Sequence, residues 1–210
     1  FSYGAMYGAA GAFGVSLTPE ALAVSLQQGT ASFPVPRTVR IRPEGALTVP
    51  AAEKDVALFL RAHPEYGSKG SFVVFGGPAL KGMPMAGRTS LCQMLDAAFV
   101  HFTEDSAFSA DCSVALGEIT PFIAGPDTPE ALSAAASLSG KAVNEVFIGG
   151  CSGGRIEDLR LAASILEGRR VPPRVRLMVA PATTEVYRQA ADEGILETFL
   201  NAGAILMNQG

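Results

Sequence analysis

The stretch Val143–Leu166, VNEVFIGGCSGGRIEDLRLAASIL, contains the clearest structural signal in this chain of 210 residues. Its first part is apolar and rich in β-branched residues up to Ile148, which predicts a buried strand. Glycines break the run between Gly149 and Gly154, and from Ile156 onward apolar residues return at steps of three and four. The stretch therefore predicts a strand, a tight loop and a helix in that order.

The glycine-rich loop is the first candidate site. Glycine permits positive φ angles and close approach to the backbone, and the free N–H groups at a helix start attract anions. Cys151 adds a soft ligand or a nucleophile in the same place. Glycine-rich strand-to-helix turns are also common as purely structural features, so both interpretations stay open. The candidate residues for binding a substrate or an anion are Ser152, Gly153, Gly154 and Arg155.

Composition narrows the class of protein. A hydrophobic content of 48% indicates a globular chain, long enough for one large or two small domains. The net charge of -4 and the lack of a basic block argue against a nucleic-acid partner. No apolar run is long enough to span a membrane, and three widely spaced cysteines suit a reducing cytoplasm. Because the chain starts at Phe1 without a methionine, we expect a piece cut from something longer.

The second half of the chain predicts alternating strands and helices, and hence a parallel sheet. Ligands of such sheets bind beyond the carboxyl ends of the strands, so the loops Gly149–Gly154 and Pro181–Thr184 could form one site. The elements expected after the first helix are a strand at Val175–Ala180, helices at Thr184–Glu193 and Ile195–Ala202, and a strand at Ala204–Met207.

The first half predicts a further α/β unit. Thr18 precedes Pro19 and Glu20, which predicts a capped helix that ends near Gly29. We expect the domains 1–33 (a helical remnant), 34–123 and 124–210, with Pro121–Pro129 as the boundary. The other expected elements are strands at Thr38–Arg42, Ser71–Phe75 and Val114–Thr120, a helix at Glu53–Ala62, and a helical stretch within Met83–Phe102 capped by Thr89 or Ser90.

Several blocks of the chain resemble one family in the same order. The segment IGGCSGGRIEDLR resembles the pattern I-G-S-C-T-N-[SG]-R-[IL]-E-D-L-R of the aconitase superfamily. RTVRIRPEGAL, GSFVVFGGPAL, AGRTSLCQM, RVRLMVAPATTEVYRQAADEG and ILETFLNAGAI are similar to further blocks, most of all in large subunits of the isopropylmalate dehydratase and homoaconitase type. The resemblance implies aconitase-like three-layer α/β/α units with mostly parallel sheets.

The resemblance also implies a hydro-lyase that moves a hydroxyl group of a small hydroxy-acid substrate, with a separate small subunit as partner. In that family three cysteines hold a [4Fe-4S] cluster. Cys151 matches the first ligand, whereas the C-G-x-C segment with the other two would follow Gly210 and the Asp-Ser-His-Thr segment would precede Phe1. We therefore expect no cluster, and no activity, in this chain alone.

Two departures lie inside the matched blocks. The family's C-T-N becomes Cys151, Ser152 and Gly153, and a carboxylate that the family uses near its substrate aligns with Ala97. Asp96 is adjacent, but on a helix it would be rotated by about 100°. These changes leave open a divergent member that binds a small carboxylate or phosphate without catalysis.

Two minor possibilities concern single side chains. Cys151 as a nucleophile or redox thiol is a weaker hypothesis, because no motif links His63 or His101 to it. Arg88 and Arg160, like Arg155, could reach an anion, although arginines at helix starts and on solvated faces are mostly structural.

Overall fold

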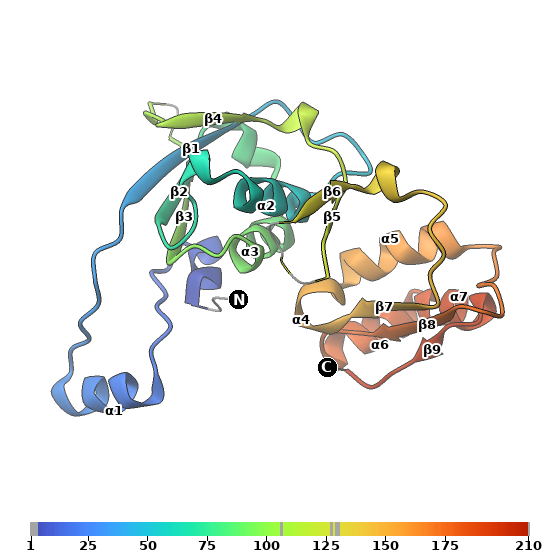
Figure 1. The fold of residues 1–210 in the computed structure, drawn as a ribbon. Helices are drawn as coiled ribbons and strands as arrows, with labels where there is room; N and C mark the ends of the chain where they lie inside the picture. Colours follow the sequence, from blue (N-terminus) through green and yellow to red (C-terminus); the bar gives the residue numbers. More distant parts are fainter. Residues whose placement is uncertain (1–3, 106, 127, 129–130, 210) are drawn as a thin grey trace. The chain divides into compact units, whose positions relative to one another are not determined.

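The computed structural model describes residues 4–105, 107–126, 128 and 131–209 of the chain (Figure 1). It divides into two compact units, the first ending at Ser139 and the second beginning at Gly140. The boundary expected between Ile123 and Ala124 falls inside a short strand of the first unit. Phe1 and Gly210, the outer ends of the expected domains, lie outside the described residues.

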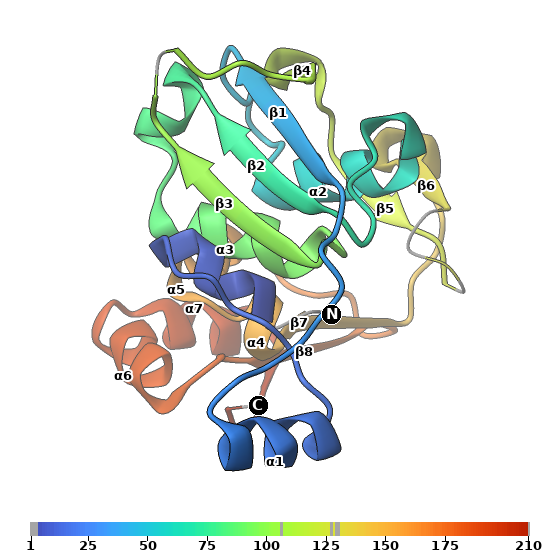
Figure 2. The ribbon, with the colours of Figure 1, turned by 90° about the vertical axis from the view of Figure 1, so that its left-hand side faces the viewer.

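The first unit is built on a parallel sheet with the order β3-β2-β1-β4, which Figure 2 shows face on. In register, Ile41 lies opposite Phe75, and Phe75 lies opposite Phe102. The elements are η1 (Gly4–Ala10), α1 (Pro19–Gln28), β1 (Thr38–Glu44), α2 (Glu53–Ala62), η2 (Pro64–Tyr66), β2 (Phe72–Gly76), η3 (Pro78–Gly82), α3 (Met85–Met94), β3 (Phe99–Thr103) and β4 (Cys112–Ala115).

The core of this unit follows from the alternation along its strands. Ile41 and Phe75 are fully buried, whereas Arg40 between two buried positions of β1 is exposed. Leu60 of α2 and Leu91 of α3 complete the same cluster. Burial of each such side chain contributes about 1.5–3 kcal/mol, so this cluster is what holds the sheet and its helices together.

Aromatic rings from the segments just before and just after α1 pack against a ring of β3. The ring centroids of Phe13 and Phe99 are 4.1 Å apart, and those of Phe33 and Phe99 are 5.4 Å apart. Between these two anchors, α1 has no buried residue and is held away from the sheet in both ribbon views (Figures 1 and 2). Thr18 Oγ1 accepts a hydrogen bond from Ala21 N at 3.2 Å, which confirms the predicted cap.

The helical stretch expected within Met83–Phe102 is shorter in the structure. The helix α3 ends at Met94, Asp96 takes a left-handed φ of 57°, and Phe99 already belongs to a strand. The predicted caps Thr89 and Ser90 were wrong, because both hydroxyls donate to carbonyls one turn earlier within α3. The apolar residues of this stretch fit a helical period as well as a strand, and the break at Asp96 decides between them.

The segment between the two sheets also differs in detail from the expectation. The strand expected at Val114–Thr120 is the shorter β4, followed by the 3-10 turn η4 (Leu116–Glu118). An antiparallel pair of short strands was not predicted. Ile123, in the proline-marked connection, pairs with Ser133, which follows that connection. Its elements are β5 (Phe122–Ala124), β6 (Leu132–Ala134) and η5 (Ala135–Leu138).

The second unit contains a three-stranded parallel sheet with the order β7-β8-β9, and its strands alternate with helices along the chain as predicted. Its core contains Leu159, Val179 and Phe199, all fully buried. The α/β class with parallel sheets predicted from the sequence is thus confirmed. The elements are β7 (Glu145–Gly149), α4 (Gly150–Gly153), α5 (Ile156–Leu166), β8 (Arg176–Ala180), α6 (Thr184–Asp192), α7 (Ile195–Ala202) and β9 (Ile205–Leu206).

Candidate functional site

The corner between β7 and α5 is shaped by two glycines that pack against the end of β8. A Cβ atom on Gly149, whose φ is 148°, would lie 2.2 Å from Ala180 O, and one on Gly154 would lie 2.5 Å from the same oxygen. Ala182 N also donates a hydrogen bond to Gly154 O at 2.9 Å. The two loops that the sequence places at one sheet edge are therefore in direct contact.

The residues between these glycines form one helical turn, α4, instead of the irregular loop that the glycines suggest. Gly154 N closes the turn by donating to Gly150 O at 3.0 Å. Cys151 lies within α4 and is exposed, and Ser152 and Gly153 are half-buried. The exposed Cys151 thus lies directly after the carboxyl end of a parallel strand, where ligands of such sheets bind.

The start of α5 carries its own negative charges. Arg155 is the N-cap residue, and its backbone N–H donates to Asp158 Oδ2 at 3.2 Å. Glu157 adds a second carboxylate to the first turn. Both carboxylates offset the positive end of the helix dipole, so the helix start alone attracts an anion less strongly. Arg155, a half-buried residue, is the positively charged side chain at this position.

The other two arginines considered from sequence are engaged in structural contacts. Arg160 forms a two-pronged ion pair with Glu193, at 2.7 and 2.6 Å, and these hydrogen bonds lower the pKa of the Glu193 carboxyl. Arg88 donates to Glu104 at 2.9 Å and stacks over the ring of Phe102, with 5.5 Å to its centroid. Each of these arginines thus has an acidic partner within its own unit.

The remaining cysteines are poor candidates for metal or nucleophilic chemistry. Cys92 is buried in the core of the first unit, and burial raises the pKa of its thiol to about 12. Cys112 on β4 is half-buried, and its pKa is raised by the same cause. Across the described ranges, no three histidine, cysteine or acidic side chains gather to hold a metal ion. A [4Fe-4S] cluster therefore does not fit the described residues alone, because the three thiolates that it needs are not gathered in one place among them.

Positions 96 and 97 do not lie on a helix as assumed from the sequence. Both follow the end of α3, so the argument from helical rotation was wrong for them. Ala97 is 2% exposed and belongs to the hydrophobic core, while Asp96 is half-buried. In this chain, the side chain at position 97 therefore supports packing.

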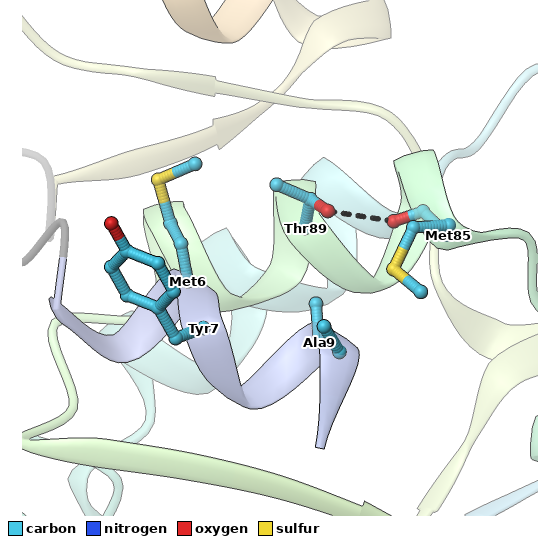
Figure 3. Close-up of a pocket in the computed structure, with 6 residues that line it drawn as sticks. Met6, Tyr7, Ala9, Met85 and Thr89 are labelled. Carbon is cyan, nitrogen blue, oxygen red and sulfur yellow. Dashed lines mark hydrogen bonds between the residues drawn. The ribbon is translucent and has the colours of Figure 1, made fainter. Parts of the chain in front are cut away.

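A hollow of about 330 Å³ in the first unit lies between η1 and α3 (Figure 3). Within it Thr89 Oγ1 donates to Met85 O at 2.8 Å, and the Tyr7 hydroxyl is the only ionisable group among the lining side chains. It offers no acid–base pair for catalysis. Its lining residues are Met6, Tyr7, Ala9, Ala10, Met85 and Thr89.

A second hollow of the first unit was not predicted from the sequence. It has a volume of about 500 Å³ and is lined by Arg42, Glu44 and the start of η3 at Pro78. The Arg42 guanidinium donates to the carbonyl of Phe108, and Ser113 Oγ donates to Glu44 at 2.8 Å. The sequence feature that could have predicted this hollow is the pair of glycine-containing turns after β1 and β2, because the ends of neighbouring parallel strands lie at the same edge of a sheet.

Comparisons of the sequence with known proteins identify its family. A family model described as Aconitase family (aconitate hydratase) matches residues 2–98 and 131–210. The chain is 31% identical over 98% of its length to a 3-isopropylmalate dehydratase large subunit of Thermodesulfovibrio yellowstonii, and covers 55% of that protein. It is 30% identical over its full length to a probable methanogen homoaconitase large subunit of Methanothermobacter thermautotrophicus, again covering 55%. The chain thus spans about half the length of these curated relatives.

A solved structure supports the fold alone. The holo form of aconitase X from Thermococcus kodakaraensis matches 84% of this chain and 44% of its own, with a TM-score of 0.52 and 13% identity. Within the described part of the chain, no helix combines the length and apolar character required to cross a bilayer.

Proposed function

This chain belongs to the aconitase family, and from that premise we propose that it is part of a hydro-lyase of the isopropylmalate dehydratase type. Such an enzyme isomerises a hydroxy-di- or tricarboxylic acid by removing and re-adding water. The observation that carries the proposal is the position of Cys151, which is exposed directly after β7. Its segment IGGCSGGRIEDLR also resembles the family motif that contains the first cluster cysteine.

In this proposal Cys151 supplies one thiolate to a [4Fe-4S] cluster, and two further cysteines come from outside these 210 residues. When bound, the cluster would supply an open iron that acts as a Lewis acid on the substrate. Ser152, Gly153, Gly154 and Arg155 would position the substrate beside it. In this proposal the chain alone is inactive, because Cys151 is the one cysteine of these 210 residues that matches a ligand position of the family.

The assembly follows from the names of the relatives. Because several are large subunits, we propose that the intact protein works with a separate small subunit. A cytoplasmic location, which a cluster and free thiols would suit, is part of the same proposal.

The test is anaerobic reconstitution with iron and sulfide, on the 210-residue chain and on the natural gene product that contains it. We expect only the longer protein to develop the broad visible absorption of a [4Fe-4S] cluster. Cys151→Ser should abolish that absorption, because one of three thiolates is lost. Cys112→Ser is the matched control and should retain it.

The proposal fails if the longer protein takes up no cluster, or if Cys151→Ser leaves the cluster intact. Substrate turnover should be measured on the same samples, with and without a co-purifying small subunit. Cluster uptake without turnover would retain Cys151 as a ligand and reject the hydro-lyase activity.

A second candidate is a member that binds a small carboxylate or phosphate at the Gly149–Arg155 corner without catalysis. The burial of Ala97, where the family has a carboxylate, favours it. In that case citrate or phosphate should slow alkylation of the exposed Cys151, and Arg155→Gln should remove the protection. Equal alkylation rates with and without these anions would exclude this candidate.

A further inference from the structure

The second unit contains an apolar hollow between β7 and α5, at the amino ends of the strands. Its volume is about 340 Å³. Val146 and Ile148 of β7 form one side, Ala162 and Ile165 of α5 form another, and the loop before β8 closes the end. The remaining lining residues are Leu166, Arg169, Arg170, Val171, Pro172, Val175 and Leu177.

The hollow exists because the helices leave the β7 side of the sheet incompletely covered. Leu177 and Val179 of the central strand β8 are buried, whereas Val146 and Ile148 at equivalent positions of β7 are only half-buried. Ile165 on α5 is 56% exposed, although it is a large apolar residue in a helix next to a core. Apolar surface therefore remains on both walls and would gain from being removed from water.

Two positive charges stand at the end of this apolar surface. Arg169 and Arg170 line the hollow, and neither guanidinium has a hydrogen-bond or ion-pair partner within the described part of the chain. They belong to the segment EGRRVPPRVR, residues 167–176, which has four arginines and one glutamate in a chain of net charge -4. Glu145 is instead engaged by Arg176, at 3.5 Å.

The two arginines also line a neighbouring polar hollow formed with Thr198 and Asn201 of α7. An anionic group held by Arg169 and Arg170 would therefore lie where the apolar hollow opens to polar surface. Apolar walls with a few convergent charged groups at one end are the usual composition of a small-molecule pocket, and 340 Å³ is within the usual size range.

We propose that this hollow binds an aliphatic carboxylate. The hydrocarbon chain lies against Val146, Ile148 and Ile165, and the carboxylate accepts hydrogen bonds from Arg169 and Arg170. Arginine suits this role because its planar guanidinium matches the geometry of a carboxylate. Both parts of such a ligand complement the hollow. The apolar walls are only partly covered by the rest of the unit, and the two guanidinium groups have no partner within its described residues.

The proposed pocket is separate from the Cys151 corner. The corner lies at the carboxyl end of β7, whereas the hollow is lined by the last turn of α5 and the loop that enters β8, at the opposite end of the strands. Binding in this hollow requires neither a cluster nor catalysis, so its test is independent of the test of the proposed hydro-lyase activity.

The test is a titration of the 210-residue chain with octanoate and, in parallel, with 1-octanol, followed by NMR of isotope-labelled isoleucine, leucine and valine methyl groups. We expect the methyl signals of Ile148 and Ile165 to shift, and those of Ile41 in the first unit to stay in place. Octanoate should bind about tenfold more tightly than octanol, because only the carboxylate gains charge-assisted hydrogen bonds.

Three variants sharpen the result. The double variant Arg169→Gln with Arg170→Gln should weaken octanoate binding about tenfold and leave octanol unchanged. Arg174→Gln is the matched control, an exposed arginine of the same segment outside the hollow, and should bind octanoate as the parent does. Ala162→Leu partly fills the hollow and should weaken both ligands.

The proposal is overturned if octanol binds as tightly as octanoate, if the double variant keeps full octanoate affinity, or if Ala162→Leu binds normally. Absence of any shift at Ile148 and Ile165 would also reject it. Thermal unfolding of each variant establishes that a loss of binding is not a loss of fold.

Discussion

The chain turns after β2 and after β7 both begin with two glycines at the end of a parallel strand. They differ in the atoms that lie beside the first glycine. At Gly76 a Cβ atom would lie 2.3 Å from the ring of Phe108, so a side chain of the first unit fills the space beside the strand end. At Gly149 the obstacle is the backbone of Ala180, and the next residues expose Cys151. Similar glycine signals thus mark a filled structural corner in one unit and an open one in the other.

The largest expected effect is on the β7 corner. Gly149→Ala should lower the free energy of unfolding of the second unit by about 3 kcal/mol, because the new Cβ meets backbone atoms that cannot move independently. Gly150→Ala is the matched control: its φ is 71° but no atom lies within 4 Å of the added carbon. It should cost about 1 kcal/mol, from backbone strain alone. Urea unfolding of both variants measures the difference, and equal losses would contradict this account.

The β2 corner should behave differently, because its obstacle is a side chain. Gly76→Ala should lower the free energy of unfolding by about 2 kcal/mol. In a Phe108→Ala background the same substitution should cost less than about half of that, since the ring is gone. A double-mutant cycle measured by urea unfolding gives the coupling between the two positions. Additive losses would show that the ring is not what excludes a side chain at Gly76.

The buried thiol of the first unit should add a pH dependence. Burial raises the pKa of Cys92 to about 12, above that of the unfolded chain, so stability is full below the unfolded pKa and falls as pH rises toward 12. Between about pH 9 and 12 the slope from this residue should approach 1.4 kcal/mol per pH unit. Cys92→Ala should flatten the curve of unfolding free energy against pH in this window, and an unchanged slope would contradict the assignment.

The smallest effects compare one arginine from each unit. Arg88 is mostly buried, donates to Leu80 O and stacks on Phe102, so Arg88→Gln should cost about 1 kcal/mol. Arg160→Gln removes a solvent-exposed ion pair with Glu193 and should cost less, with the loss disappearing at high salt. Arg88→Gln also removes the ion pair with Glu104, so only part of its loss should disappear at high salt. Chemical unfolding at low and high salt distinguishes the two, and a loss at Arg88 that disappears as completely as the loss at Arg160 would contradict this interpretation.

Much of the fold was accessible from the sequence because the relevant signals are local. Alternation predicted β1, and the cap at Thr18 with Gly29 predicted α1 closely. The helix Ile195–Ala202 agrees at both ends with the prediction. For both helices, residues next to the element determine its ends, through a capping hydrogen bond or glycine in a left-handed conformation.

Errors arose where a distant contact or a single backbone angle decides. The apolar spacing around Asp96 fits a helix, yet its left-handed φ ends the helix and lets Phe99 enter the sheet. The pairing of β5 with β6 depends on residues about ten positions apart, across a proline-rich connection that predicted only a turn.

The sequence by itself determined the parallel α/β class and the family resemblance, because periodicity and motifs are properties of neighbouring residues. The role of Cys151 as a cluster ligand stays a prediction from the same motif. Only the tertiary structure decided that Cys92 is buried and Cys151 exposed, and that position 97 belongs to the core. It alone revealed the hollow at Arg169 and Arg170. The exposure of a residue and the shape of the surface around it depend on which distant segments of the chain pack there. A local sequence pattern does not contain that information.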